Sequence, residues 1–271
     1  MATGDLTEGA DGLPVVKVGP WAKEKLEYVK RYCHIFNAGM KKQWGTRTYI
    51  DLFSGAGRCL VETTNEEIDG SALVALQSEP PFTHYFFNDM EPRAINALER
   101  RSAGFETVSL QFFNEDCNNA IEGIVKKLPQ RALHFCFIDP TNWQIRFTSI
   151  QKLSSGKRMD LAITFHTGQI KRVALDAPKL LDDFFGDSSW RVKYQEMQAS
   201  GKREGSRVLL DAYEEKLRGL GYKDIQDWIL EKNRKGVPLY HLLFASKHTR
   251  GKDFWDKISQ KLPSGQIRLG L

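Results

Sequence analysis

Hydrophobic positions along the chain follow two alternating patterns. Short runs of aromatic and β-branched residues, typical of buried strands, alternate with stretches whose apolar residues recur every three or four positions, as in helices packed on one side. The predicted strands are 48–53, 84–88, 109–113, 133–138 and 159–165. The predicted helices between and before them are 21–36, 70–77, 92–101 and 118–128. Strands separated by helices indicate right-handed crossover connections and a largely parallel sheet.

The pattern changes after the fifth strand. Two further helices are expected at 168–185 and 206–221, and two strand candidates follow at 222–230 and 237–246. The connection between these strands is so short that they must pair antiparallel. We therefore predict an α/β fold with a Rossmann-like, seven-stranded, mostly parallel sheet, a C-terminal antiparallel β-hairpin and helices on both faces. Such a sheet is typical of methyltransferases rather than dehydrogenases.

Composition suggests how this fold is divided. Residues 1–16 are polar, with glycines and a proline, and are predicted to be a flexible tail. Residues 17–271 would then form a single domain, within which the Gly-, Ser- and basic-rich stretch 186–205 is expected to be a mobile insertion.

The overall composition excludes several classes of protein. The 271 residues are 41% hydrophobic, which suits an ordinary globular protein. No apolar run approaches the roughly 18 residues of a membrane-spanning helix, and the N-terminus has no hydrophobic signal core. The four cysteines have no C-x-x-C spacing, and neither the histidines nor the carboxylates have metal-ligand spacing. We expect a cytoplasmic protein with no metal and no contact with a membrane.

Charge is distributed unevenly around a net value of +5. Residues 17–47 hold eight Lys or Arg against two Glu, and residues 232–271 hold nine against two Asp. Segment 200–207 is also basic. Basic segments favour phosphate-rich partners, so we expect contact with DNA or RNA through these three segments. Solubilising lysines on terminal helices explain the same pattern.

The sequence YIDLFSGAG (49–57) is the best local signal for a binding site. A buried strand brings Asp51 and Phe53 to its carboxyl end, and Gly55 and Gly57 permit a tight turn in which the backbone can approach a ligand. The full G-x-G-x-x-G pattern is not met, because Leu60 stands where the third glycine would be. This departure favours an adenosyl ligand over a dinucleotide.

Acidic residues follow the next two strands. Asp89, after the second strand, can accept hydrogen bonds from ribose hydroxyls, and it can equally cap the helix that begins with Pro92. Asp116, after the third strand, can accept from an adenine amino group or simply cap the following helix. A glycine turn followed by two acidic strand ends in this order predicts an adenosyl pocket more firmly than either acid alone.

The fourth strand ends in FIDPTNW (137–143), where the crevice of an open α/β sheet lies. Asp139 can position an amine and accept a proton, Asn142 can orient the acceptor and Trp143 can stack on a base. An ordinary Asp-Pro turn with a buried Trp anchor is the competing interpretation. His166, at the end of the fifth strand, lies near the same rim and is more often structural in such a position.

Two resemblances follow from these motifs. DLFSGAG and NDME resemble the cofactor and ribose motifs of class I S-adenosylmethionine-dependent methyltransferases. More closely, the chain resembles the three-Cys-motif partner (TcmP) family, a bacterial family of methyltransferase-like fold. The matching pieces are GPWAKEKLEYVKRY, YIDLFSGAG, GSALVAL, YFFNDMEP, FIDP, LLDDFFGD and LYHLLFASKHTRGKDFWDKI.

The resemblance implies S-adenosyl-L-methionine as cofactor and a protein partner encoded nearby. It places Asp51, Phe53, Gly55 and Gly57 in the cofactor loop, Asp89 at the ribose and Asp116 at the adenine edge.

The chain departs from the methyltransferase pattern after Asp139. Enzymes that methylate amino groups of nucleic acid usually carry D/N-P-P followed by an aromatic residue, whereas here Thr141 and Asn142 follow Pro140. No cysteine follows a proline, so the nucleophile of enzymes that methylate pyrimidine carbons is missing.

Two functions therefore remain. The first is a methyltransferase acting on a nitrogen or oxygen of nucleic acid, and the alternative is a non-catalytic S-adenosylmethionine-binding module that works through a protein complex. A nicotinamide-dependent enzyme is disfavoured by the incomplete glycine pattern.

Overall fold

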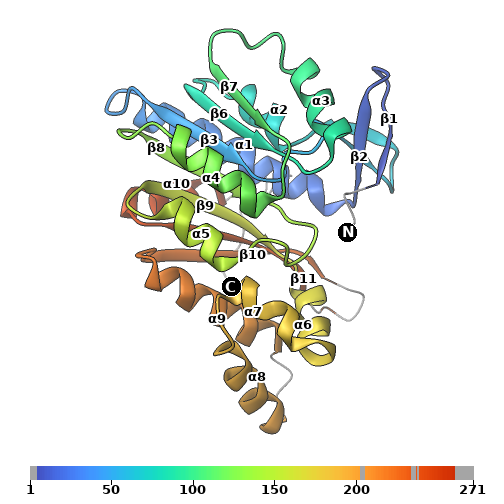
Figure 1. Cartoon of the computed structure of the whole chain (residues 1–271), viewed down its shortest axis with the longest axis vertical. Coiled ribbons are helices and arrows are strands. Elements are labelled where there is room, and N and C mark those ends of the chain that lie inside the picture. Colours follow the sequence, from blue (N-terminus) through green and yellow to red (C-terminus); the bar gives the residue numbers. More distant parts are fainter. Residues whose placement is uncertain (1–4, 202–204, 233–235, 237, 260–271) are drawn as a thin grey trace.

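The computed structural model describes residues 5–201, 205–232, 236 and 238–259. Its centre is a seven-stranded sheet in the order β10-β11-β9-β8-β3-β6-β7 (Figure 1). Five strands are parallel, and β11 lies antiparallel between β9 and β10. This confirms the predicted fold class, including the C-terminal hairpin. The strands are β3 (Arg47–Asp51), β6 (His84–Asn88), β7 (Ser109–Phe113), β8 (Leu133–Ile138), β9 (Arg158–Phe165), β10 (Asp224–Lys232) and β11 (Pro238–Ser246).

Helices cover both faces of this sheet because its central strands are apolar on both sides. In β8, Phe135 and Phe137 belong to one buried cluster, whereas Cys136 and Ile138 belong to the other. The first face is covered by α1 (Trp21–Met40), α2 (Ser71–Leu76), α3 (Pro92–Arg101) and α10 (Thr249–Ser259). The second is covered by α4 (Cys117–Lys127), α5 (Phe147–Ser154), α6 (Thr167–Asp176), α7 (Asp182–Phe185) and α9 (Gly205–Gly219).

The prediction of a flexible N-terminal tail is wrong from residue 6 onward. The chain forms β1 (Leu6–Glu8) and β2 (Pro14–Val18), and β2 pairs in parallel with β4 (Arg58–Val61), which in turn pairs with β5 (Glu66–Asp69). Gly9 and Gly12 lie in the turn of a hairpin, Pro14 begins its second strand opposite Glu8, and Val15 is fully buried.

Arg101 fastens this small sheet to the main domain. Its guanidinium donates to the carbonyl oxygens of Pro14 at 2.7 Å and Ala56 at 2.5 Å, and it forms an ion pair with Asp11 at 2.7 Å. The N-terminal hairpin and the glycine loop after β3 are therefore held by one side chain.

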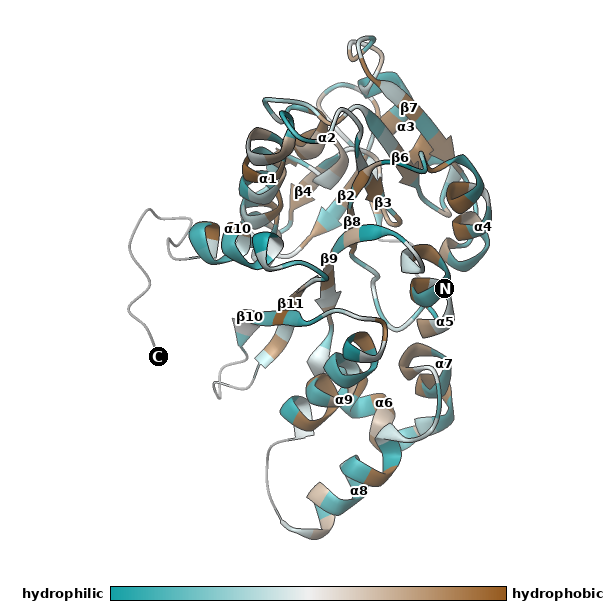
Figure 2. Cartoon of the chain, turned by 90° about the vertical axis from the view of Figure 1, so that its left-hand side faces the viewer, coloured by the Kyte–Doolittle hydropathy of each residue, from teal (hydrophilic) through white to brown (hydrophobic). Residues whose placement is uncertain are grey.

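The prediction of a mobile insertion at 186–205 is wrong over most of that segment. Helix α8 (Trp190–Ala199) occupies it and lies beside α9 at the end of the molecule farthest from β7 (Figures 1 and 2). Trp190 is buried, stacks on Phe185 with ring centroids 5.0 Å apart and donates its indole N–H to Asp182 at 3.1 Å. Apolar anchoring fixes a segment whose polar composition suggested a loop, and residues 202–204 lie outside the described residues.

None of the helices in the described ranges combines the length and apolar character that crossing a bilayer requires. All four cysteines, which lie within these ranges, carry free thiols.

Candidate functional site

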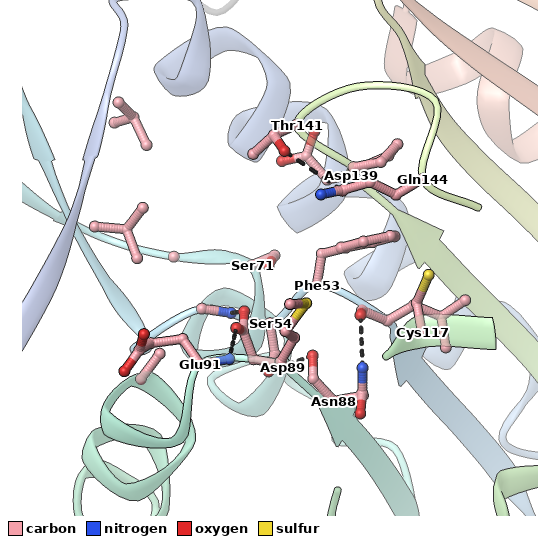
Figure 3. A pocket seen from close by; sticks show the side chains of 18 of the residues that line it. Phe53, Ser54, Ser71, Asn88, Asp89, Glu91, Cys117, Asp139, Thr141 and Gln144 are labelled. Carbon is pink, nitrogen blue, oxygen red and sulfur yellow. Dashed lines mark hydrogen bonds between the residues drawn. The ribbon is translucent and has the colours of Figure 1, made fainter. Parts of the chain in front are cut away.

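A cavity of about 690 Å³ opens at the carboxyl ends of β3, β6 and β8 and the loop after β7. Figure 3 shows Asp89 and Glu91 on one side of it, Asp139 and Thr141 on the other, and Phe53 between them. Residues of β2 and α1 complete the wall. The crevice is therefore where the sequence placed it, but the N-terminal sheet encloses it as well.

The glycine loop has the backbone that the sequence suggested. Gly55 and Gly57 have φ angles of 58° and 82°, a region that side-chain-bearing residues rarely adopt. A Cβ on Gly55 would lie 3.2 Å from the Val16 side chain, so β2 approaches the loop closely. Gly55 and Phe53 line the cavity, whereas Gly57 lies behind it and accepts a hydrogen bond from the Gly70 N–H at 2.7 Å.

Asp51 does not line the cavity. It is fully buried beneath the loop, where its carboxylate accepts hydrogen bonds from the Phe53 N–H and the Tyr49 hydroxyl, both at 3.2 Å. Burial raises the pKa of Asp51 to about 7, although these hydrogen bonds favour the charged form. Asp51 thus supports the loop rather than facing a ligand.

Asp89 joins two loops at the cavity. Its carboxylate oxygens accept one hydrogen bond each, from the Gly55 N–H and the Glu91 N–H, both at 2.9 Å. Glu91, not Asp89, caps α3 by accepting from the Arg93 N–H at 3.2 Å. Burial raises the pKa of Asp89. The Met90 backbone also interacts with this carboxylate, but a carboxylate has about four acceptor positions, so Asp89 remains able to accept from ligand hydroxyls.

Asp116 both caps a helix and lines the cavity. Its side chain accepts from the Asn118 N–H at 2.9 Å at the start of α4. Asn118 and Cys117 line the cavity beside it. The two interpretations of Asp116 are therefore compatible.

Asp139 makes a contact that the sequence did not reveal. Its Oδ2 lies 2.5 Å from the Lys25 Nζ of α1, with only 8% of the lysine side chain and 24% of the aspartate side chain exposed. Burial alone would raise the pKa of Asp139, but the charge and hydrogen bond of Lys25 outweigh it and hold this pKa below its usual value. Lys25 lies on the same helical face as Ala22 and Val29. A charged residue within this apolar stripe was the sequence feature that could have indicated a buried ion pair.

The residues after Asp139 divide between the cavity and its surroundings. Trp143 lines the cavity and also packs on the hydrophobic core, which agrees with its interpretation as an anchor. Thr141 lines the cavity and donates to Gln144 at 3.4 Å. Asn142, predicted to orient the acceptor, is not among the lining residues.

His166 contributes its ring to the cavity wall. It is 8% exposed, its two ring nitrogens are buried, and the Pro140 backbone interacts with the ring. Its ring meets Tyr240 edge-on at 4.8 Å, and Tyr240 stacks on Trp21 at 4.6 Å. Burial lowers the pKa of His166 to about 4, so its imidazole is neutral at pH 7.

No group of three or more His, Cys, Asp or Glu side chains in the described part of the chain could hold a metal ion. The cavity offers carboxylates, backbone N–H groups, aromatic rings, a neutral histidine and the cations Lys17, Lys25 and Arg146, of which Lys25 is paired with Asp139.

No family model and no curated protein matches the sequence. The structure is similar to protein LPL1258 of family DUF519 from Legionella pneumophila, with a TM-score of 0.57 and 9% identity over 90% of this chain and 94% of that one. This likeness shows a shared fold.

Structures of S-adenosylmethionine-dependent methyltransferases are also among the neighbours. The N-methyltransferase NodS from Bradyrhizobium japonicum, in complex with S-adenosyl-l-homocysteine, has a TM-score of 0.41 and 9% identity over 85% of this chain and 89% of that one. TYW2 from M. jannaschii, in complex with AdoMet, has a TM-score of 0.41 and 13% identity over 91% and 87% of the two chains.

Asp51 should make stability depend on pH. Because its folded pKa lies above its unfolded value, ionisation opposes folding, and the free energy of unfolding should fall as pH rises from about 4 to about 7. Asp51→Asn, which cannot ionise, should remove roughly 2–4 kcal/mol of this fall. Urea unfolding at several pH values measures it, and parallel pH profiles for the two proteins would contradict the burial argument.

The Lys25–Asp139 pair should couple strongly. Lys25→Met leaves a buried carboxylate unpaired and should lower the free energy of unfolding by about 2–4 kcal/mol at pH 7. The loss should shrink as pH falls, because protonated Asp139 no longer needs a cation. The double variant Lys25→Met, Asp139→Asn should lose less free energy of unfolding than the sum of the losses in the two single variants. A loss equal to that sum would show that the two side chains do not stabilise each other.

Proposed function

We propose that this protein binds S-adenosyl-L-methionine in the crevice and transfers its methyl group to a nitrogen or oxygen of nucleic acid. The observation that carries the proposal is the bridging position of Asp89. Its carboxylate fixes the Gly55 N–H and keeps acceptor capacity toward the cavity. A volume of about 690 Å³ falls in the usual range for a small-molecule site.

The cofactor would be held by residues from four loops. Gly55 and Phe53 would lie against it, Asp89 would accept from the ribose hydroxyls, and Asp116 with Asn118 would meet the adenine edge. Bound S-adenosylmethionine supplies a methyl group on a positively charged sulfur. Asp51 and Gly57 contribute by holding the loop in shape.

The reacting end of the crevice would be formed by Asp139, Trp143 and His166. Lys25 keeps Asp139 ionised, so its carboxylate can accept a hydrogen bond from an N–H or O–H group and orient the lone pair beside it. Neutral His166 lines the same end of the crevice, and the proton that methylation of such a group releases would pass to water. Trp143 offers an aromatic face to a base.

Charge supports nucleic acid as the substrate. The basic segments 17–47 and 232–271 contribute α1 and α10, which pack against each other. Segment 200–207 supports it less. Arg207 is held by the carboxylates of Asp211, Glu214 and Asp227, and residues 202–204 lie outside the described residues.

The second candidate is a cofactor-binding module without activity, acting in a complex with a protein partner as the TcmP resemblance implies. Two observations favour it. Thr141 and Asn142 replace the usual proline and aromatic residue, and Lys25 already occupies one carboxylate oxygen of Asp139.

Cofactor binding is the first test. S-adenosylhomocysteine should bind with micromolar affinity, about 8 kcal/mol, in calorimetry. Asp89→Ala should weaken binding by roughly 1–3 kcal/mol, because hydrogen bonds to a charged acceptor are lost. The matched control is Glu115→Ala. Glu115 is exposed in the neighbouring loop, and its carboxylate does not line the cavity. Absence of heat with the unaltered protein would exclude both candidate functions.

Transfer of a labelled methyl group separates the enzyme from the module. With total DNA and RNA as acceptors, Asp139→Asn should abolish labelling and leave S-adenosylhomocysteine binding within about twofold of the original, because Asp139 acts at the acceptor end. Asp183→Ala, at the exposed rim of the same cavity, should retain activity. Cofactor binding without label in DNA or RNA would favour the module.

A further inference from the structure

A second cavity, of about 390 Å³, lies at the opposite end of the sheet. It is lined by the amino ends of β8 and β9 and by the residues that follow β11. Because a strand rises about 3.3 Å per residue, the six residues of β8 separate it from Asp139 by roughly 20 Å. We call it the basic cavity, and its lining includes His134, Lys157, Arg158, Lys247 and Arg250.

The cations of the basic cavity are not neutralised by carboxylates. Within the described residues, none of Lys157, Arg158, Lys247 and Arg250 forms an ion pair. Burial lowers the pKa of Lys157 and Lys247, and the charge of Lys157 lowers that of Lys247 further. An anion between these side chains would relieve their repulsion.

The acidic group of the lining is already engaged. Asp160 accepts hydrogen bonds from the Tyr32 and Ser246 hydroxyls, both at 2.6 Å. Burial raises its pKa to about 6. Both of its carboxylate oxygens are therefore engaged by hydroxyl groups.

His134 forms a neutral part of the lining. It is 1% exposed, and its Nδ1 is buried without a hydrogen-bond partner in the described part of the chain. Burial, reinforced by the charge of Lys157, lowers the pKa of His134 to about 4, so the ring is neutral at pH 7. The positive charge of the basic cavity therefore comes from its lysines and arginines.

The remaining wall is apolar and aromatic. Phe36, Met40, Trp44 and Phe254 line it, and the Arg158 guanidinium lies over the Trp44 ring at 5.3 Å from the centroid. A free inorganic anion would leave this wall unused. A ligand that carries both a phosphate and a flat, less polar part would use both walls.

We propose that the basic cavity binds a nucleotide, with its phosphate among Lys157, Arg158 and Arg250 and its base or sugar against the apolar wall. The nucleotide is either free or one unit of a nucleic-acid strand, since both present the same chemistry. This site is separate from the crevice, and the proposal does not depend on methyl transfer.

Thymidine nucleotides test the proposal, because they lack the adenine that the crevice would attract. Calorimetry would measure binding of thymidine monophosphate and of an oligothymidylate of about eight nucleotides at ~50 mM salt. Replacing Lys157, Arg158 and Arg250 together with alanine should weaken binding at least about tenfold. The control replaces three exposed basic residues that line neither cavity, Arg100, Lys126 and Arg172, and should change affinity less than about twofold.

Thermal melting of each variant checks that it folds. Binding of the monophosphate identifies a free nucleotide, and binding of the oligonucleotide alone identifies a strand. No binding of either probe to the unaltered protein, or equal losses in the triple variant and its control, would overturn the proposal. Retention of S-adenosylhomocysteine binding in all variants keeps this result distinct from that for the crevice.

Discussion

Lys25 and Asp139 meet at 2.5 Å in a largely buried contact between the first helix and the end of a central strand. Removing two charges from water is expensive, and well-packed apolar side chains are often as stable in their place. The pair instead fixes the position of α1, because Lys25 must reach Asp139 at the end of β8. Since α1 begins three residues after β2, the same contact determines where the N-terminal sheet lies. One wall of the crevice therefore depends on an interaction at its reacting end.

Asp89 fixes the position of the loops at the other end of the crevice. Its two hydrogen bonds fix the loops after β3 and β6 relative to each other, and Asp51 holds the first of these loops from below. Arg101 then joins that loop to the hairpin. The cavity is thus bounded by backbone segments far apart in the sequence, each fixed by a charged side chain, and a ligand entering it would meet preorganised donors and acceptors.

The sequence predicted the main sheet because parallel strands buried on both faces appear as nearly continuous apolar runs, as in LHFCFI. The N-terminal sheet escaped prediction because its strands are three to five residues long and half exposed, so no period could be recognised. Helix α8 escaped because two aromatic anchors, Trp190 and Tyr194, lie among polar residues. At the site, Asp51 and Asp89 look alike in sequence, and only the fold shows that one lies under the loop and the other faces the cavity.

The lysine partner of Asp139 also bears on how the crevice could work. A carboxylate held ionised by a cation is a weak proton acceptor, yet it has about four lone-pair positions, of which Lys25 uses one. Aligning a nucleophile against a sulfonium requires orientation more than basicity, and a hydrogen bond to the remaining lone pairs provides it. The proton released by transfer would then pass to water, because burial lowers the pKa of His166 to about 4 and its buried imidazole is a weak base as well. An ion-paired aspartate is therefore compatible with catalysis as the group that orients the acceptor.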